Sequence, residues 1–407
     1  MGSTSEWPGT LDVRDLAAGG WRPAPFREFV LKIHSRCNLA CDYCYMYEMA
    51  DQSWRLQPRQ MTRPVIGWAA ARIGEHAREH RLPRIKLILH GGEPTLADPD
   101  LITHAIHAVR IAAGADVRVD VTVQTNGVGL DDSFLEMFAE LGARVGVSID
   151  GDAAAHDRHR IRRNGHGSYT AVAASIRRLA AHPRREDLFG GLLCTVDVRN
   201  DPVATYEALL EFGPPMIDFL LPHGNWSEPP PFRVPGSANT PYADWLIAVF
   251  DRWYAARRRE TRIRVLSELM CTVLGGASGT ESVGLSPVAA TVIETDGSIQ
   301  QCHALKSAFP GAPRTGLHVR NDSFDAALGH SAVAATQLGV RALCPTCLDC
   351  ALHRICGAGH YAHRYRAGTG FYNPSVYCPD LFKLISHVRG VLADDVAKLT
   401  SDAKDRR

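Results

Sequence analysis

Short apolar runs alternate with amphipathic segments between residues 29 and 259. Six runs have the length and composition of buried strands, and they cover residues 29–33, 85–90, 117–124, 145–149, 191–196 and 217–221. Each run precedes a segment whose apolar residues recur at helical spacing, and the predicted helices cover residues 62–77, 98–113, 131–141, 168–181, 201–212 and 242–259. This alternation predicts parallel strands joined by right-handed helical crossovers.

The number of strand–helix units narrows the fold class to α/β with two possible architectures. Six units predict a partial (β/α)6 barrel, similar to a TIM barrel but not closed by eight strands. An open doubly wound sheet is the alternative. In both architectures the functional site lies at the carboxyl ends of the strands.

Changes in composition divide the chain into five predicted regions. These are an N-terminal segment (1–25), the barrel (26–225), a bridging region (226–290), a cysteine-rich region (291–390) and a C-terminal tail (391–407). A proline-dense stretch at 222–241 marks the first boundary after the barrel. The sequence from residue 292 to residue 299, with Asp296-Gly297 at its centre, predicts a β-hairpin.

Bulk composition excludes several classes of function. The chain has 407 residues, 45% of them apolar, and a net charge of +1, so charge gives no reason to expect a nucleic-acid or membrane-surface partner. No apolar run approaches the roughly 20 residues of a membrane-spanning helix. Eleven cysteines without a recognisable secretory signal predict a cytoplasmic protein whose thiols bind metal instead of forming disulfides.

Three cysteines follow the first predicted strand. Cys37, Cys41 and Cys44 have the spacing C-x3-C-x2-C, which places three thiolates on one tight loop. A cubane iron–sulfur cluster normally takes four cysteine ligands, so a cluster held here would leave one iron open to a small molecule. A zinc knuckle and buried free cysteines are the alternatives.

Polar residues and glycines follow the next three strands. They are Gly91, Gly92 and Glu93 after the second strand, Gln124 and Asn126 after the third, and Ser148 and Asp150 after the fourth. Two adjacent glycines allow a backbone to approach a ligand closely. Arg160, farther along the loop after the fourth strand, could meet a carboxylate, although a solvated basic loop is an equal alternative.

A second group of cysteines occupies the C-terminal region. Four of them have the spacing C-x2-C-x5-C followed by a distant fourth: Cys347, Cys350, Cys356 and Cys378. Four thiolates can hold an iron–sulfur cluster or a zinc ion, and the spacing alone does not separate the two. Cys302 and Cys344 are additional candidate ligands.

The stretch from Cys37 to Tyr45 resembles the cluster-binding loop of radical S-adenosylmethionine (SAM) enzymes, and Gly91-Gly92-Glu93 resembles their GGE motif. The resemblance implies that the three cysteines hold a [4Fe–4S] cluster whose open iron is chelated by SAM. An electron from a reductant such as flavodoxin or ferredoxin would then release methionine and a 5′-deoxyadenosyl radical. The resemblance also favours the partial barrel over the doubly wound sheet. It further implies that the residues named above at the ends of the second, third and fourth strands contact SAM, together with Arg160.

The C-terminal cysteines resemble the SPASM extension of radical SAM enzymes. The resemblance implies an auxiliary [4Fe–4S] cluster on the four spaced cysteines of that region. The chain departs from the usual pattern at His360, where a further cysteine is expected. A second auxiliary cluster would therefore have to recruit ligands from Cys302, Cys344, Cys271 or His360.

Several stretches resemble FxsB-type radical SAM proteins, namely residues 33–37, 45–48, 280–285 and 359–365. This resemblance implies a ribosomally made precursor peptide as substrate and a cyclophane-type cross-link between a side-chain carbon and an aromatic ring. Other radical modifications remain open, namely thioether formation, epimerisation and the oxidation of Ser or Cys. A metal-stabilised peptide-binding scaffold without catalysis is the alternative from another class.

His303 is the candidate catalytic base. In sulfatase-maturing relatives an aspartate that serves as base follows the cysteine of a Gly-x4-Cys element, and here Gly297 and Cys302 are followed by His303. A histidine can accept a proton near neutral pH.

Overall fold

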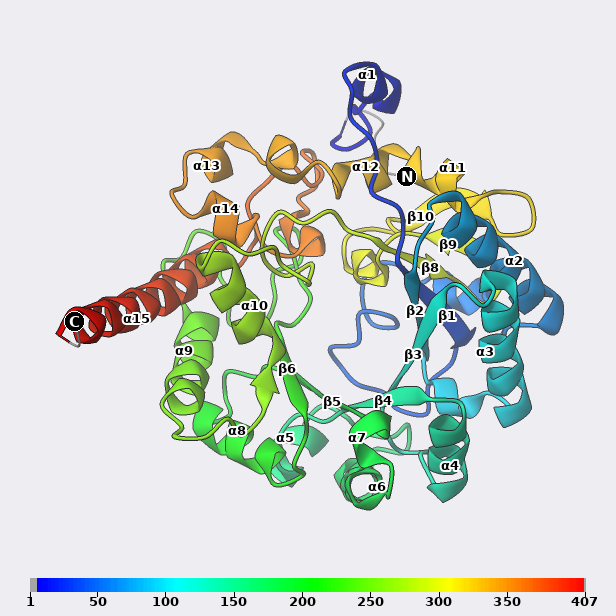
Figure 1. Cartoon of the computed structure of the whole chain (residues 1–407), viewed down its shortest axis with the longest axis horizontal. Helices are drawn as coiled ribbons and strands as arrows, with labels where there is room; N and C mark the ends of the chain where they lie inside the picture. Colours follow the sequence, from blue (N-terminus) through cyan, green and yellow to red (C-terminus); the bar gives the residue numbers. More distant parts are fainter. Residues whose placement is uncertain (1–5, 406–407) are drawn as a thin grey trace.

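The structure, a computed structural model, describes residues 6–405. Residues 1–5 of the predicted N-terminal segment and residues 406–407 of the predicted tail lie outside the described residues. Six parallel strands curve around a common interior with helices outside them (Figure 1). They are β1 (Glu28–His34), β2 (Arg84–Gly91), β3 (Arg118–Thr125), β4 (Ala143–Ser148), β5 (Phe189–Thr195) and β6 (Met216–Leu220).

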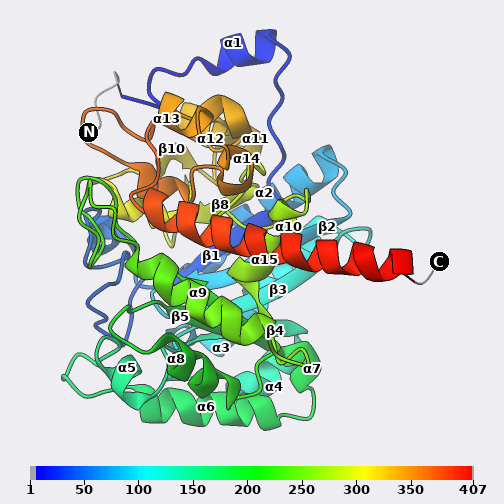
Figure 2. The same ribbon diagram turned by 90° about the vertical axis from the view of Figure 1, so that its left-hand side faces the viewer.

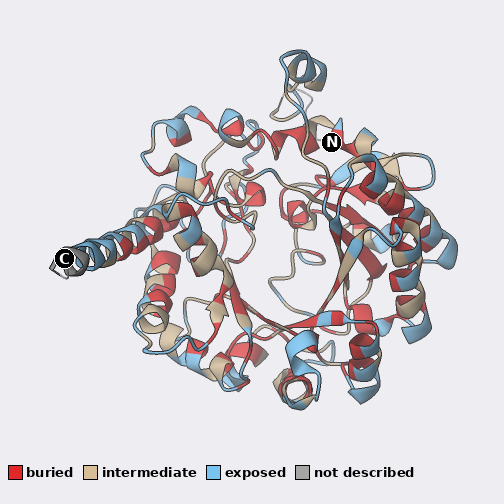
Figure 3. Ribbon diagram, in the orientation of Figure 1, coloured by how far each residue is buried: buried red, intermediate tan, exposed pale blue. Residues whose placement is uncertain are grey.

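The strand order confirms the partial barrel. β1 to β6 pair in chain order, each parallel to the next, whereas a doubly wound sheet reverses direction at a switch point. The crossover helices α2 (Arg63–Glu79), α3 (Pro99–Ala113), α4 (Asp132–Glu140), α6 (Tyr169–Ala181) and α8 (Pro202–Leu210) turn their buried sides toward the strands (Figure 3).

Helix α9 (Pro241–Tyr254) is shorter than the predicted 242–259. Short elements that the periodicity did not indicate lie before the barrel, in the connections between its units, and in the C-terminal extension. They are α1 (Val13–Ala18), α5 (Ala153–Asp157) and α7 (Arg185–Leu188), and the 3-10 turns η1 (Ser53–Leu56), η2 (Pro94–Leu96), η3 (His303–Ser307), η4 (Gly339–Ala342) and η5 (Tyr361–Arg364). Elements of three to six residues are too short for a periodic pattern to emerge.

Helix α6 begins where it was predicted but is capped by a residue from elsewhere. The Ser168 hydroxyl donates to the carbonyl of Arg160 at 2.6 Å instead of capping its own helix. Asp157 Oδ1 accepts the backbone N–H groups of Ser168 and Tyr169, each at 2.8 Å. The start of α6 is therefore connected by hydrogen bonds to the loop after β4, which carries Arg160.

The predicted hairpin forms, and it extends the barrel sheet. β8 (Ala290–Ile293) pairs parallel with β1, and β9 (Ser298–Gln300) and β10 (Arg314–His318) continue antiparallel. At the other edge, β7 (Arg262–Ile263) pairs with β6 and leads into α10 (Arg264–Val273). One ten-stranded sheet thus runs through the predicted boundary at residue 290.

Small helices follow the hairpin and lie across the open side of the barrel (Figure 1). They are α11 (Phe324–Leu328), α12 (Ser331–Ala335), α13 (Pro345–Leu348) and α14 (His353–Cys356). Helix α15 (Cys378–Asp405) then packs against α9 and α10, crosses the predicted start of the tail, and projects past the barrel (Figure 2). Within residues 6–405, no helix has both the length and the apolar character needed to cross a membrane.

Two glycines of α2 provide a matched test of the helix layer. A Cβ added at Gly74 would lie 2.1 Å from the carbonyl oxygen of Ala112 in α3, whereas a Cβ at Gly67 would meet nothing within 4 Å. We expect Gly74→Ala to destabilise the fold by about 1–3 kcal/mol, because α2 and α3 must separate. Gly67→Ala should stabilise it by up to about 1 kcal/mol through helix propensity. Urea unfolding followed by circular dichroism measures both, and equal shifts would contradict the described packing.

Candidate active site

The cysteine loop lies at the carboxyl end of β1. It is attached to the loop after β4, since the N–H of Ala40 donates to the carbonyl of Ile161 at 2.8 Å. Within the loop, the N–H of Cys44 donates to the carbonyl of Cys41 at 3.1 Å, which closes a tight turn. The three cysteines are partly buried and carry no disulfide.

The environment of these thiols suits a bound cation. Burial raises the pKa of Cys37 and of Cys41 to about 12 and that of Cys44 to about 11, so the thiolates need a positive partner at neutral pH. Donors to one sulfur are already in place, because the N–H of Leu39 and the amide of Asn126 lie 3.4 and 3.5 Å from Cys37 Sγ. Hydrogen bonds to cysteine sulfur are typical of iron–sulfur sites.

The sulfur positions can be compared with those around a bound zinc ion. A tetrahedral zinc ion with Zn–S bonds of about 2.3 Å holds its sulfurs about 3.8 Å apart. Among the described residues, no three cysteine sulfurs lie within 4.8 Å of one another. Within residues 6–405, no three cysteine sulfurs thus have the close spacing that one bound zinc ion imposes.

The two glycines after β2 are required by contact with the cysteine loop. The N–H of Gly92 donates to the carbonyl of His34 at 2.8 Å. A Cβ at Gly91 would lie 2.1 Å from that same carbonyl oxygen, and a Cβ at Gly92 would lie 1.8 Å from the Tyr47 hydroxyl. Any larger residue would push the end of β2 away from the loop.

Glu93 connects β2 to β3. Its carboxylate is fully buried and accepts from Thr125 Oγ1 at 2.6 Å and from the N–H of Asn126 at 2.7 Å. Thr95 supplies two further donors to Oε1, while Oε2 has the single partner at Asn126. A contact between Glu93 and SAM, which the sequence resemblance implies, would therefore use Oε2.

Asp150 and Arg160 form a buried ion pair at the end of β4. Arg160 Nε donates to the Asp150 carboxylate at 2.8 Å, and the Tyr43 hydroxyl of the cysteine loop donates to the same carboxylate. Burial alone would raise the pKa of Asp150, but the Arg160 guanidinium outweighs it and the pKa is lowered. Arg160 is only 9% exposed, so the solvated-loop alternative is wrong.

Gln124 and Ser148 meet across β3 and β4, where Gln124 Nε2 donates to Ser148 Oγ at 3.0 Å.

Two further polar residues near the cysteine loop were not predicted from the sequence. They are Lys32 and His90, which are register partners in β1 and β2. Burial lowers the pKa of Lys32 to about 8 and that of His90 to about 3. The one sequence feature that could have indicated Lys32 is that it is a single lysine within the otherwise apolar run of residues 29–33.

His303 lies beside the cysteine loop. Its ring centroid is 4.8 Å from that of His90 and 5.4 Å from that of Tyr45, the residue after Cys44. Its Nδ1 is buried without a hydrogen-bond partner. Burial holds the pKa of His303 well below its usual value, so the imidazole is neutral.

The structure brings the predicted auxiliary cysteines together. Five thiols from α13, α14, the start of α15 and the adjoining loops lie near enough to shift one another's pKa, and they are Cys344, Cys347, Cys350, Cys356 and Cys378. The Arg364 guanidinium lies beside them and donates to the carbonyl of Gly359 at 2.7 Å. Cys344 therefore belongs with the four spaced cysteines.

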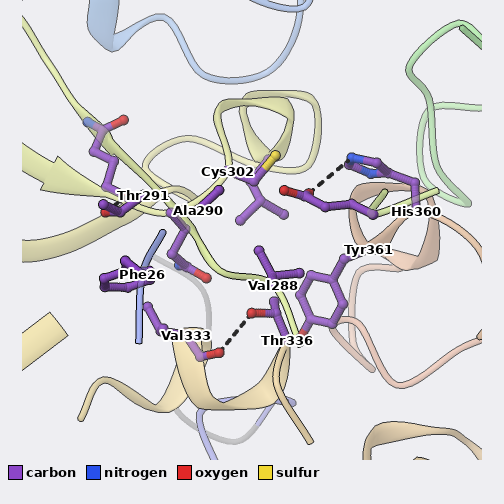
Figure 4. Close-up of a pocket in the computed structure, with 13 residues that line it drawn as sticks. Phe26, Val288, Ala290, Thr291, Cys302, Val333, Thr336, His360 and Tyr361 are labelled. Carbon is purple, nitrogen blue, oxygen red and sulfur yellow. Dashed lines mark hydrogen bonds and ion pairs between the residues drawn. The ribbon is translucent and has the colours of Figure 1, made fainter. Parts of the chain in front are cut away.

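Cys302 lies in a different group. Its sulfur lies with ligand atoms of Glu281 and His360, all within 4.8 Å of one another, around a cavity of about 20 Å³ (Figure 4). His360 Nε2 is 3.6 Å from the Glu281 carboxylate. Cys271 is exposed. Of the candidates for a second auxiliary cluster, only Cys302 and His360 lie together.

Comparison with known proteins identifies the class of domain. The model of the radical SAM superfamily matches residues 31–197. The chain is 25% identical to a serine-type anaerobic sulfatase-maturating enzyme of Klebsiella aerogenes over 87% of this chain and 84% of that protein. It is 24% identical to a cysteine-type enzyme of Clostridium novyi (strain NT) over 66% of this chain and 71% of that protein.

Solved structures of the same architecture cover most of this chain. Native anSMEcpe with bound AdoMet superposes with a TM-score of 0.75 at 20% identity, covering 90% of this chain and 98% of that one. Streptococcus suis SuiB bound to precursor peptide SuiA superposes with a TM-score of 0.54 at 14% identity, covering 91% and 79%.

The fold, the three-cysteine loop and the superfamily match together define a radical SAM domain. This domain lies within residues 31–197, and the chain is similar in sequence to anaerobic sulfatase-maturating enzymes. Its cofactors are accordingly a [4Fe–4S] cluster and SAM, and the cysteine-rich C-terminal region is consistent with auxiliary clusters.

His156, which contacts the backbone of Asp150, predicts that the stability of the folded protein falls at acid pH. His156 is fully buried, its Nδ1 accepts the Asp150 N–H at 3.3 Å, and burial lowers its pKa to about 4. Between pH 6.5 and pH 4 the unfolded chain binds a proton at this histidine and the folded chain does not, so stability falls as the pH falls through this window.

We expect the loss in the free energy of unfolding between pH 7.5 and pH 4.5 to be smaller by about 1–3 kcal/mol in His156→Gln than in the wild type. Urea midpoints at pH 7.5 and pH 4.5 measure the difference. The exposed His107 of α3 provides the control His107→Gln, which should keep the wild-type dependence. An unchanged dependence in His156→Gln would mean that the imidazole titrates normally in the folded protein.

Proposed function

We propose that this protein is a radical SAM peptide maturase that removes two hydrogens from a peptide substrate and joins a side-chain carbon to an aromatic ring. The observation that carries the proposal is the meeting of the cysteine loop, the GGE segment and a neutral His303 at one end of the barrel. Radical generation and proton removal would then occur at neighbouring positions.

The chain's own residues would divide into holding and orienting groups. Cys37, Cys41 and Cys44 would hold the first cluster, while Glu93 Oε2 and Asn126 would contact SAM. The four spaced cysteines of the extension would hold an auxiliary cluster. When bound, these groups supply a hydrogen-abstracting 5′-deoxyadenosyl radical and, in the extension, an acceptor for the second electron.

His303 would accept the proton that leaves the substrate with the second electron. Its Nδ1 is buried, unpartnered and neutral, so a lone pair is available without first breaking a hydrogen bond. Lys32 and His90 would orient the substrate, because they are buried polar groups next to the same loop. Burial also excludes water from the reacting groups.

A peptide substrate is supported by the comparisons. One solved relative contains anSMEcpe with bound AdoMet and the Cp18Cys peptide, and superposes with a TM-score of 0.76 over 92% of this chain. Cross-linking is supported by two stretches of FxsB-type resemblance, 280–285 and 359–365, whose Glu281 and His360 lie 3.6 Å apart beside Cys302.

The second candidate function is oxidation of a Ser or Cys side chain to an aldehyde. Similarity to serine-type and cysteine-type sulfatase-maturating enzymes favours it. Both candidates need a hydrogen-abstracting radical and a proton acceptor, so the site geometry serves either one. The product distinguishes them.

The product of a peptide reaction tests the proposal. Anaerobically reconstituted enzyme, SAM and dithionite should convert a ribosomally made precursor peptide that contains an aromatic residue to a product about 2 Da lighter. A cross-link suppresses fragmentation between the joined residues and leaves no group that reacts with a hydrazide probe. An aldehyde from Ser has the same mass loss and reacts with the probe, which would support the second candidate.

Matched cysteine variants complete the experiment. Cys37→Ala should abolish both 5′-deoxyadenosine release and the peptide product, because the cluster loses a ligand. The exposed Cys271 gives the control Cys271→Ala, which should retain both. Release of 5′-deoxyadenosine by Cys37→Ala would contradict the site assignment.

A further inference from the structure

A histidine–aspartate cluster joins the barrel to the extension. His76 in α2 and His80, the residue that caps this helix, are four positions apart and so lie on the same face. Asp325 reaches them from α11, 245 residues beyond His80. Both histidines direct a ring nitrogen at the same oxygen, with His76 Nδ1 and His80 Nε2 each 2.8 Å from Asp325 Oδ1.

We propose that His76, His80 and Asp325 form a binding site for a divalent transition-metal ion of the zinc type, which fastens the extension to the barrel. Their three ligand atoms all lie within 4.8 Å of one another. Two imidazoles and one carboxylate are a donor set that zinc uses when it keeps a fourth position for water.

The burial of the three side chains suits such a site. The His76 side chain is 1% exposed, whereas those of His80 and Asp325 are 26% and 36% exposed. The buried histidine would be a fixed ligand, and the two others can move and leave room for a water ligand. Zinc needs its donors about 3.4 Å apart, so the present 2.8 Å contacts must open by roughly half an ångström.

The surroundings of His76 orient its ring. Three aromatic rings surround the imidazole, with centroids 5.9 Å away for Phe26, 6.0 Å for Phe29 and 5.9 Å for Phe324. Its remote Nε2 is buried without a partner. The ring directs Nδ1 at Asp325, and Nε2 can carry the proton when Nδ1 binds a metal.

Hydrogen bonds alone are the competing explanation, and they leave a different signature. In that case each imidazole donates one N–H to the two lone pairs of Asp325 Oδ1, and no metal is required. Asp325→Asn keeps an oxygen that can accept both N–H groups but removes the anionic ligand. The variant thus preserves the hydrogen-bonded arrangement and weakens only metal binding.

The test uses the full-length enzyme after iron–sulfur reconstitution, so that the cluster cysteines are occupied. Zinc is added from a chelator-buffered solution, and bound zinc, iron and sulfide are measured per chain. The wild type should bind about one zinc ion whose X-ray absorption shell contains nitrogen and oxygen ligands. Affinity should fall more than about 100-fold in His80→Ala and in Asp325→Asn, with iron and sulfide unchanged.

His107→Ala, which removes an exposed histidine from the neighbouring helix α3, is the matched control and should bind zinc like the wild type. Zinc binding that is equal in His80→Ala and the wild type, a sulfur-rich zinc shell, or no bound zinc in the wild type would each overturn the proposal. Because iron content and SAM cleavage are measured separately, its failure is distinguishable from failure of the proposed function.

Discussion

The buried ion pair between Asp150 and Arg160 is the contact on which the site depends. It ties the end of β4 to the loop that follows it, and the Tyr43 hydroxyl ties the cysteine loop to the same carboxylate. Removing one partner of such a pair leaves an uncompensated buried charge and costs about 3–5 kcal/mol. The position of Cys37, Cys41 and Cys44 relative to the barrel therefore depends on this ion pair as well as on packing.

At the same end of the barrel the backbone of β2 lies very close to the cysteine loop. This close approach explains why the residues there are two glycines followed by a hydrogen-bonded glutamate. Gly91 and Gly92 let β2 touch the cysteine loop, and Glu93 consumes most of its hydrogen-bonding capacity in joining β2 to β3. These residues form a rigid frame around the cysteines. His303, by contrast, keeps a buried Nδ1 without a hydrogen-bond partner.

Much of the fold was predictable because its signals are local. Strand and helix periodicity identified all six barrel units, and the cysteine spacing identified both cysteine groups. Lys32 and His90 escaped prediction because their neighbourhood arises from the register of β1 against β2, which spacing along the chain does not encode. The same holds for the link between Cys302, Glu281 and His360, and for the sheet that runs on from β1 into β8.

The central claim is that Cys37, Cys41 and Cys44 hold a cluster with one iron open to SAM. Electron paramagnetic resonance of the dithionite-reduced protein, recorded with and without SAM, tests it most directly. Auxiliary clusters can be silenced for this purpose by Cys347→Ala combined with Cys378→Ala. The account predicts a reduced [4Fe–4S] signal whose g values change when SAM is added. A signal indifferent to SAM, or zinc in place of iron, would contradict it.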